Sequence, residues 1–319
     1  MELRVLEYYL MVAREENITK AAQLLHITQP TLSRQLMQLE EELGVSLFER
    51  GKHRIFLTDD GLLLKRRAQE LVELADKTKK DFHREEGELT GEITIGSGET
   101  QSVRFLGKAA ARFHKSYPRV TFHLHSATAD DIKDRIEKGL IDIGLLTEPV
   151  DVGRYGFIRI SRKEQWGVMV DKASPLAGKK GVTPEDLAKV PLFISQRERV
   201  QHELANWFGD WFDRLTILGT YNLLYNAVLM TEDFGGAVLC FQHGNCYENA
   251  VFVPFDPPLR TGCVVVWKKN HVCTPATGRF IEYLRAMGAG EEEDWIAGRS
   301  LKGKEPICPE GAGEAPGKR

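Results

Sequence analysis

Polar side chains that can hydrogen-bond to the edges of DNA bases lie close together near residue 30. Arg34 has paired N–H donors that suit guanine, and Gln29 has a donor and an acceptor that suit adenine. Thr31 and Ser33 lie within the same six residues, and Pro30 directly follows Gln29. These residues can read a base sequence only if one face of a secondary-structure element presents them together.

A helix-turn-helix is predicted to position them. Thr19 is expected to cap a first helix over 20–25, and Thr28 a second, because a threonine hydroxyl can accept from a free first-turn N–H. Pro30 falls in the first turn of the second helix, where a proline loses no hydrogen bond. A leucine stripe predicts that the opposite face is buried: Leu32, Leu36, Leu39 and Leu43. This arrangement places the second helix in a DNA major groove, although periodicity alone also fits an amphipathic helix of another small domain.

The segment AAQLLHITQPTLSRQLMQLEEELGVSLFER (21–50) resembles the N-terminal domain of LysR-type transcriptional regulators. The resemblance is dense as far as residue 61 and continues more loosely to about residue 290. It implies a regulator that binds double-stranded DNA as a dimer and responds to a small-molecule effector. The residues that carry it are Ala21, Ala22, Leu24, Gln29, Pro30, Ser33, Leu39, Glu40, Leu43, Gly44, Leu47, Phe48, Arg50, Leu57, Thr58 and Gly61.

The predicted fold class is α/β with four parts. Residues 1–58 form a winged helix-turn-helix, and residues 59–87 form a linker helix. Residues 88–290 form an effector-binding domain, and residues 291–319 are rich in Gly, Glu, Lys and Pro, which predicts a disordered tail. In the first part, a helix packs behind the motif through Leu3, Leu6, Leu10 and Ala13. A hairpin over 48–58 forms the wing, whose expected phosphate contacts are Arg50, Lys52 and Arg54.

The linker helix carries an apolar repeat with alternating steps of four and three. The repeat consists of Leu64, Ala68, Leu71, Ala75, Thr78 and Phe82, and it predicts a coiled-coil seam. We expect a second copy of the chain to cover this seam, and the resemblance implies the same dimer interface and assembly to a homotetramer. The alternative is that the helix packs on its own domain.

The effector-binding domain begins after a hinge over 87–91. Strands predicted over 93–97, 120–126 and 141–147 alternate with helices, which predicts a parallel sheet. Further strands are predicted over 166–170, 192–195, 215–221, 235–241 and 263–268, and a last helix over 276–287. The resemblance implies two Rossmann-like subdomains, as in a periplasmic binding protein: the first over about 91–161 and 268–290, the second over about 162–267.

Ligands in open α/β sheets bind beyond the carboxyl ends of the strands, near helix N-termini whose free N–H groups favour an anion. The resemblance implies that the corresponding loops line an inducer cleft. Glu99 departs from the small hydroxyl residues common at the first loop. It would repel an anion unless it points away or pairs with Arg197, so an amine or a zwitterion becomes more plausible; alternatively, Glu99 only caps the helix. The candidate effector-binding residues are Ser97, Gly98, Glu99, Thr100, Gln101, Ser126, Thr128, Thr147, Ser195, Arg197, Tyr221 and Asn222.

Composition excludes several other classes. The net charge of −3 does not by itself indicate a nucleic-acid partner, but phosphate contacts need only local positive charge. The sequence shows neither a membrane-spanning apolar run nor a signal peptide, so we expect a cytoplasmic protein. The five cysteines form no CxxC pair. Cys240, His243 and Cys246 are three soft ligands where a structural zinc site prefers four, so we expect no metal and no cofactor.

The sequence shows no recognisable nucleophile–base pair or cofactor-binding loop, so we expect a regulator and not an enzyme. Two alternatives remain at this stage. One is a constitutive DNA-binding protein with a vestigial cleft, and the other is an enzyme of the two-subdomain α/β type. Turnover of a cleft ligand would favour the enzyme, and a cleft that binds nothing would favour the constitutive protein.

Overall fold

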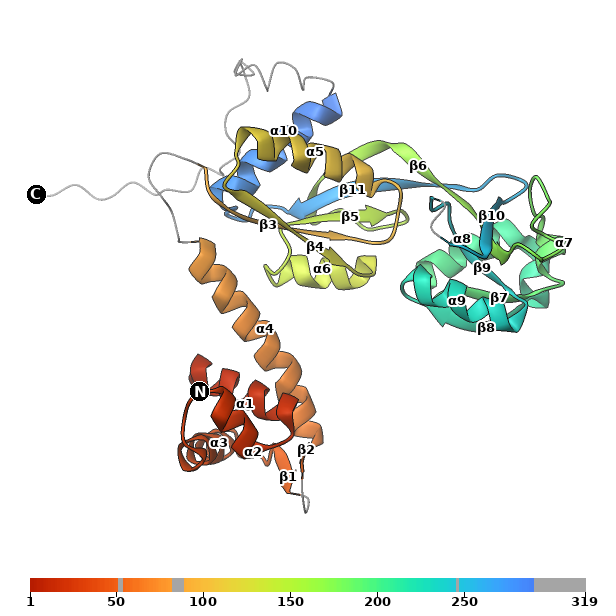
Figure 1. Cartoon of the computed structure of the whole chain (residues 1–319). Coiled ribbons are helices and arrows are strands. Elements are labelled where there is room, and N and C mark those ends of the chain that lie inside the picture. The colour runs from red at the N-terminus through yellow and green to blue at the C-terminus, as the bar shows by residue number, and fades with distance from the viewer. Residues whose placement is uncertain (51–53, 82–88, 245–246, 290–319) are drawn as a thin grey trace, which may run out of the picture. The chain divides into compact units, whose positions relative to one another are not determined.

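The computed structural model describes residues 1–50, 54–81, 89–244 and 247–289 (Figure 1). They form two compact units, one within residues 1–83 and the other within residues 84–319. The predicted disordered tail, part of the predicted hinge, Phe82 and Lys52 lie outside the described residues.

The first unit is a winged helix-turn-helix, as predicted. Its buried core includes Leu6, Tyr9, Val12, Leu32 and Leu36, contributed by α1 and α3. A short antiparallel pair of strands forms the wing, with Phe48 opposite Leu57. The elements are α1 (Leu3–Glu15), α2 (Ile18–Leu24), α3 (Gln29–Leu43), β1 (Phe48–Arg50), β2 (Ile55–Leu57) and α4 (Asp59–Asp81).

The helix caps follow the sequence with one correction. The Thr28 side chain accepts from Thr31 N at 3.4 Å and caps α3, as expected. The prediction that Thr19 caps the preceding helix was wrong, because Asn17 accepts from Lys20 N at 3.0 Å and α2 therefore begins at Ile18.

Two predicted apolar faces are also corrected. Of the four residues predicted on the inner face of α1, only Leu6 is buried; the others are partly exposed, and Val5, Tyr9 and Val12 take their place. Leu43, at the end of the stripe on α3, is 39% exposed. The helix ends at Gly44, whose φ of 71° turns the chain away, so Leu43 lies beyond the core.

Helix α4 packs partly on its own unit. Ala68 is fully buried, and Leu64 and Val72 pack against the same core. The Tyr9 hydroxyl donates to the Gly61 carbonyl at 2.5 Å, and a Cβ at Gly61 would lie 2.2 Å from the Leu47 carbonyl oxygen. The first two seam positions therefore serve their own domain. Other leucines of α4 are exposed, including the third seam position, Leu71, together with Leu63 and Leu74.

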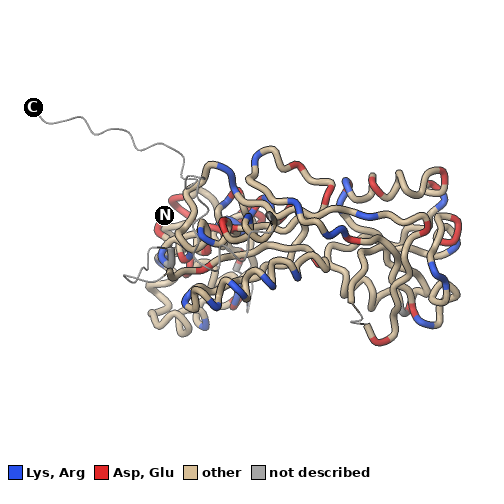
Figure 2. Tube along the Cα trace, turned by 90° about the horizontal axis from the view of Figure 1, so that it is seen from above, with Lys and Arg blue, Asp and Glu red and all other residues tan. Residues whose placement is uncertain are grey.

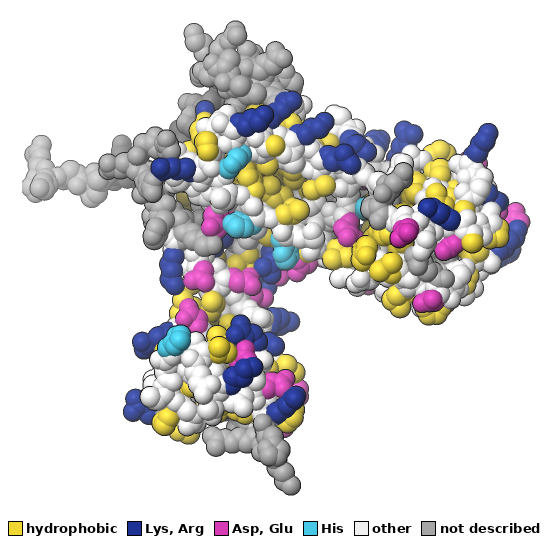
Figure 3. Space-filling view, in the orientation of Figure 1, with side chains coloured by type: hydrophobic (Ala, Val, Ile, Leu, Met, Phe, Trp, Pro, Cys, Tyr) yellow, Lys and Arg dark blue, Asp and Glu magenta, His cyan; other side chains and the backbone are white. Residues whose placement is uncertain are grey.

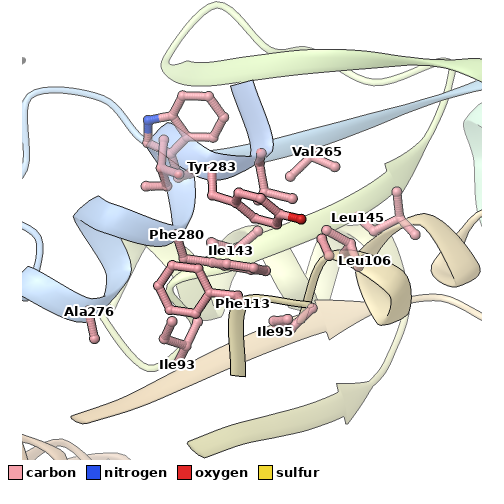
Figure 4. Close-up of a cluster of buried hydrophobic side chains, with 14 of the residues drawn as sticks. Ile93, Ile95, Leu106, Phe113, Ile143, Leu145, Val265, Ala276, Phe280 and Tyr283 are labelled. Atoms are coloured by element: carbon pink, nitrogen blue, oxygen red, sulfur yellow. The ribbon is translucent and has the colours of Figure 1, made fainter. Parts of the chain in front are cut away.

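The first half of the second unit contains the predicted parallel strands β3 (Gly91–Ser97), β4 (Val120–Ser126) and β5 (Ile143–Thr147). Helices α5 (Val103–Ser116) and α10 (Pro275–Ala289) cover one face of this sheet, and α6 (Ala129–Glu137) covers the other (Figure 1). Aromatic rings join α5 to α10, with the centroids of Phe113 and Phe280 5.0 Å apart (Figure 4).

The second half surrounds the carboxyl end of β6 (Tyr155–Asp171). This strand pairs with β11 through Gln165 and with β9 from Trp166 onward, so β6 and β11 connect the halves. The amino-terminal half of β6 and the whole of β10 were not predicted from the sequence. The remaining elements are α7 (Pro184–Leu187), β7 (Pro191–Ser195), α8 (Glu198–Phe208), the 3-10 helix η1 (Gly209–Arg214), β8 (Thr216–Tyr221), α9 (Leu224–Phe234), β9 (Ala237–Phe241), β10 (Ala250–Pro254) and β11 (Arg260–Lys268).

The chain returns to the first half earlier than predicted. Cys263 to Val266 of β11 already pair with β5, whereas the sequence placed the return near residue 267. The reason is that β11 runs as one strand from the junction into the first sheet, without a turn to mark the boundary. None of the helices in the described ranges is both long and apolar enough to cross a bilayer.

Candidate functional site

The outer face of α3 gathers the residues predicted to contact DNA bases. Thr28, Gln29, Pro30, Thr31 and Arg34 are exposed, and Ser33 is partly exposed. Gln29 Nε2 donates to Ser33 Oγ at 2.7 Å, and the hydroxyls of Thr28 and Thr31 lie 2.8 Å apart. Arg34 makes no hydrogen bond or ion pair with any residue in the described ranges, so its guanidinium can bind a ligand without breaking a contact.

The wing positions only part of the predicted phosphate-binding set. Arg50 is the last residue of β1. Arg54 lies just before β2, with its Nη1 3.4 Å from Glu16 Oε2. Because the Arg54 side chain is 71% exposed, this ion pair is weak and can be exchanged for a phosphate.

A cavity of about 90 Å³ opens in the second unit, with lining residues from both halves. Three predicted residues do not line it. Ser97 is buried and donates to the Gly98 carbonyl at 2.7 Å, and Ser126 is exposed at the end of β4. The Gln101 side chain accepts from Arg104 Nε at 2.8 Å. The predicted residues that line the cavity are Gly98, Glu99, Thr100, Thr128, Thr147, Ser195, Arg197, Tyr221 and Asn222.

Glu99 reaches across the cleft. It follows β3 in the first half, and its Oε2 accepts a hydrogen bond from the backbone N–H of Leu224, the first residue of α9 in the second half. Glu99 therefore caps a helix, but a different helix from the one that follows it in sequence. A carboxylate at a helix N-terminus is favourable, because free N–H groups and the helix dipole both stabilise negative charge there.

Arg197 forms a second connection across the cleft. Its Nε lies 3.3 Å from Asp130 Oδ2 and its Nη1 lies 3.5 Å from Thr147 Oγ1, both in the first half. A pairing with Glu99, which the sequence left open, is not among the contacts of the described residues. Burial acts to raise the pKa of Asp130, but hydrogen bonding to Lys133 and the charge of Arg197 outweigh it and lower the pKa below its ordinary value.

The helix start after β3, expected to be open to an anion, is already occupied. Glu164 of β6 is 2% exposed, and its Oε1 accepts from Ser102 N at 2.7 Å and from Ser102 Oγ at 2.5 Å. Its Oε2 accepts from Gln101 N at 3.3 Å. A carboxylate from the junction between the halves therefore fills the anion site at the start of α5.

Three aromatic side chains of the cleft were missed as effector-binding candidates: Trp166, Phe241 and His243. His243 Nδ1 lies 2.7 Å from the Phe241 carbonyl oxygen, and Nε2 lies 2.9 Å from the Glu99 carbonyl oxygen. The sequence singled out His243 only as a possible metal ligand. Phe241 is the last residue of β9, so the rule that ligands bind beyond the carboxyl ends of strands could have identified it. Trp166 lies within a long strand and gave no such signal.

A metal at this position finds no support in the part of the chain that the structure describes. Cys240 is buried, and burial raises the pKa of its thiol, which disfavours the thiolate that a metal needs. No cluster of three metal-ligating side chains occurs within the described residues, and Cys246 lies outside them.

Comparison with known proteins identifies both units. A family model described as "Bacterial regulatory helix-turn-helix protein, lysR family" matches residues 3–62. A second, described as "LysR substrate binding domain", matches residues 86–289. The chain is 34% identical to the HTH-type transcriptional regulator BsdA of Bacillus subtilis, over 88% of this chain and 99% of BsdA. It is 32% identical to the regulator AlsR of Bacillus subtilis, over 62% of this chain but only 65% of AlsR.

Solved structures show the same fold. CbnR, a LysR family transcriptional regulator, has a TM-score of 0.72 at 22% identity, covering 90% of this chain and 99% of CbnR. Full-length CbnR in complex with its target DNA has a TM-score of 0.69. These proteins are regulators and not enzymes, in agreement with the sequence. The chain therefore belongs to the LysR family of bacterial helix-turn-helix transcriptional regulators, with a DNA-binding domain followed by a LysR substrate-binding domain.

Proposed function

We propose that this regulator binds a partly palindromic operator and that a small effector, bound in the cleft of the second unit, changes its assembly or the bending of its DNA. The observation that carries the proposal is the capped, exposed and polar face of α3, with Arg34 unpaired among the described residues. Gln29, Pro30, Thr31, Ser33 and Arg34 enter the major groove.

The groups that hold phosphates flank this face. Arg50, Lys52 and Arg54 of the wing contact the DNA backbone, and Thr28 lies at the N-terminus of α3, where backbone N–H groups favour an anion. Backbone contacts fix the position of the protein on DNA, and contacts to bases select the sequence.

The exposed face of α4 supports a homodimer. Leu63, Leu71 and Leu74 are 52%, 41% and 39% exposed, and no described residue of the same unit covers them. A second copy of α4 would bury these leucines, and the resulting two-fold symmetry suits an operator with two half-sites.

A separate apolar surface supports assembly to a tetramer. On α9, Tyr225, Leu229, Met230 and Phe234 are exposed, as are Ile217 and Leu218 of the edge strand β8. Figure 3 shows hydrophobic side chains gathered on this part of the second unit. Exposed apolar patches of this kind mark contact surfaces, and a surface distinct from α4 allows dimers to join.

The effector acts through the closure of the cleft. Glu99 and Arg197 both join the two halves. A ligand shifts the arrangement of subunits only as far as it binds one arrangement more tightly than the other. The bending of operator DNA would change with that arrangement.

DNase footprinting on the DNA upstream of the protein's own gene, with a salt titration against random DNA, tests the proposal. We expect protection of a two-fold site and a steep loss of affinity with salt, because phosphate contacts release counterions. Equal and weak binding to both DNAs would contradict sequence-specific regulation. Operator binding that no metabolite changes would indicate a constitutive DNA-binding protein.

A further inference from the structure

We propose that the cleft takes a small organic amine, bound as its ammonium ion with Glu99 as counter-charge. This inference rests on the proposed function of the cleft as the effector site and adds the chemical class of the ligand. Three features of the described residues support it: the charge of the cleft, its surplus of acceptors and its aromatic walls.

The cleft has little positive charge to offer an anionic ligand. The N-terminus of α5 is filled by Glu164 and that of α9 by Glu99, and α6 begins with Asp130 and Asp131 in its first turn. The charge of Arg197 is shared with Asp130. The other cations among the described residues of this unit lie outside the cleft, and four of them belong to α5: Arg104, Lys108, Arg112 and Lys115. Figure 2 shows how basic and acidic residues are distributed along the chain.

Hydrogen-bond acceptors are in surplus in the cleft. Glu99 uses Oε2 for Leu224, and no described residue donates to its Oε1. Thr100 is 8% exposed, and its hydroxyl, which can both donate and accept, is buried without a partner in the described structure. The carbonyl oxygens of Phe241 and Glu99 both face the ring of His243, 2.7 and 2.9 Å from its two nitrogens. An ammonium group supplies three donors and no acceptor, which suits this surplus.

Aromatic side chains form part of the cavity wall. Trp166, Tyr221 and Phe241 all line it, and the ring centroids of Trp166 and Phe241 lie 4.2 Å apart. The Tyr221 hydroxyl donates to the Leu239 carbonyl at 2.6 Å, so it is not free for a ligand acceptor. Aromatic faces attract cations, and this attraction grows when water is excluded.

The same contacts give the amine a way to act. Glu99 belongs to the first half of the unit, whereas Tyr221 and Phe241 belong to the second. An ammonium ion held between them binds the closed cleft more tightly than an open one. Ligand binding therefore shifts the equilibrium toward closure.

Calorimetric titration of the full chain with three probes of matched size tests this proposal: propylammonium, propionate and 1-propanol. Three-carbon probes suit a cavity of about 90 Å³. We expect propylammonium to bind at least tenfold more tightly than propionate. Tighter binding of propionate, or no detectable binding of propylammonium, would overturn the proposal.

Glu99→Gln separates charge from shape. Glutamine keeps an oxygen that can accept from Leu224 N, so α9 retains its cap while the counter-charge is lost. We expect the Kd for propylammonium to rise at least tenfold, with the propanol affinity unchanged. Glu198→Gln removes an exposed charge from the first turn of α8, outside the cavity, and should leave all three affinities unchanged.

Phe241→Leu provides a second test in case Glu99→Gln fails to fold. We expect this variant to lose preference for propylammonium over 1-propanol, and an unchanged preference would overturn the aromatic part of the proposal. Footprinting without ligand keeps the two proposals distinguishable. If the cleft prefers propionate and operator binding is intact, only the proposal of an amine ligand is rejected. If the cleft binds propylammonium but the protein does not bind the operator, only the proposal of operator binding is rejected.

Discussion

Arginine side chains have opposite surroundings on the outer face of α3 and in the cleft of the second unit. On α3, Arg34 is exposed and has no partner among the described residues. In the cleft, Arg197 is only 10% exposed in its side chain and is paired with Asp130 and Thr147. Arg34 lies in the amino-terminal half of α3, and Arg197 directly precedes α8. Only Arg34 is available for a new partner.

This difference follows from the cost of burial. An exposed guanidinium is hydrated, so leaving it without a protein partner costs the folded state little free energy. A buried charge, in contrast, must be paired within the protein. A surface helix can therefore present its reading groups one by one. In the cleft, Glu99 and Arg197 already have partners within the protein. We therefore expect the remaining acceptors and aromatic rings to select a ligand.

The strongest test of the comparison asks whether the two units are independent. Leu36 is 3% exposed in the core of the first unit. We expect Leu36→Ala to destabilise that unit by about 2–5 kcal/mol, because the lost methyl groups leave a cavity. Scanning calorimetry should show one lowered transition, with the transition of the second unit unchanged. Equal shifts in both transitions would show that the units fold together.

The two faces of α4 give the next effect. If Leu74 is buried between two copies of the chain, Leu74→Glu should weaken the dimer by roughly 1.5–3 kcal/mol, the value of one buried leucine. Sedimentation equilibrium measures this change. Leu62→Glu alters an exposed leucine on another face of the same helix and should leave the dimer intact. Equal weakening by both variants would count against the assigned face.

Arg34 tests the exposed side of the comparison. We expect Arg34→Ala to weaken specific operator binding by about 1–3 kcal/mol, with little change on random DNA. Arg14→Ala, in α1, removes an arginine that is paired with Glu15 and serves as the control. Fluorescence anisotropy with both DNAs distinguishes the outcomes, since an equal loss on random DNA would make Arg34 a phosphate contact only.

The smallest effect concerns a carboxylate near the cleft. Thr261 donates to Glu203 Oε1 at 2.9 Å, and Glu203 Oε2 is buried without a partner in the described structure. Burial, together with the charge of Glu148, raises the pKa of Glu203 above its ordinary value of 4.5. Its ionisation therefore costs the folded state stability as the pH rises from 4.5 through the raised pKa.

Glu203→Gln removes the stability loss that comes from ionising Glu203 in the folded state. We expect the free energy of unfolding of this variant, relative to the wild type, to increase with pH across that interval and then to level off. Urea unfolding of the second unit at several pH values measures the difference. A difference that does not change with pH would show that Glu203 keeps its ordinary pKa when folded.

Local signals predicted much of this protein. The cap at Thr28, the proline in the first turn and the leucine stripe fixed α3, because each depends on residues within a few positions of one another. The strands β3, β4 and β5 followed from apolar runs. Strand β10 and the start of β6 were missed, since their pairing partners are distant in sequence.

The candidate cleft was predicted less completely than the fold. The rule that ligands bind at strand ends placed Glu99, Thr100, Arg197 and Tyr221 at one cavity. It gave no indication that Glu164 would fill the start of α5, because that carboxylate comes from a strand 62 residues away from Ser102.

The sequence by itself determined the family, the helix α3 with its polar face, and the loops that come together at the cleft. Only the tertiary structure decided which charges meet there: Glu99 with the start of α9, Arg197 with Asp130, and Glu164 with the start of α5. It also decided which face of α4 packs on its own unit. The physical reason is range, since helix caps and periodic faces are local properties of the chain. Ion pairs across a cleft depend instead on how distant segments pack.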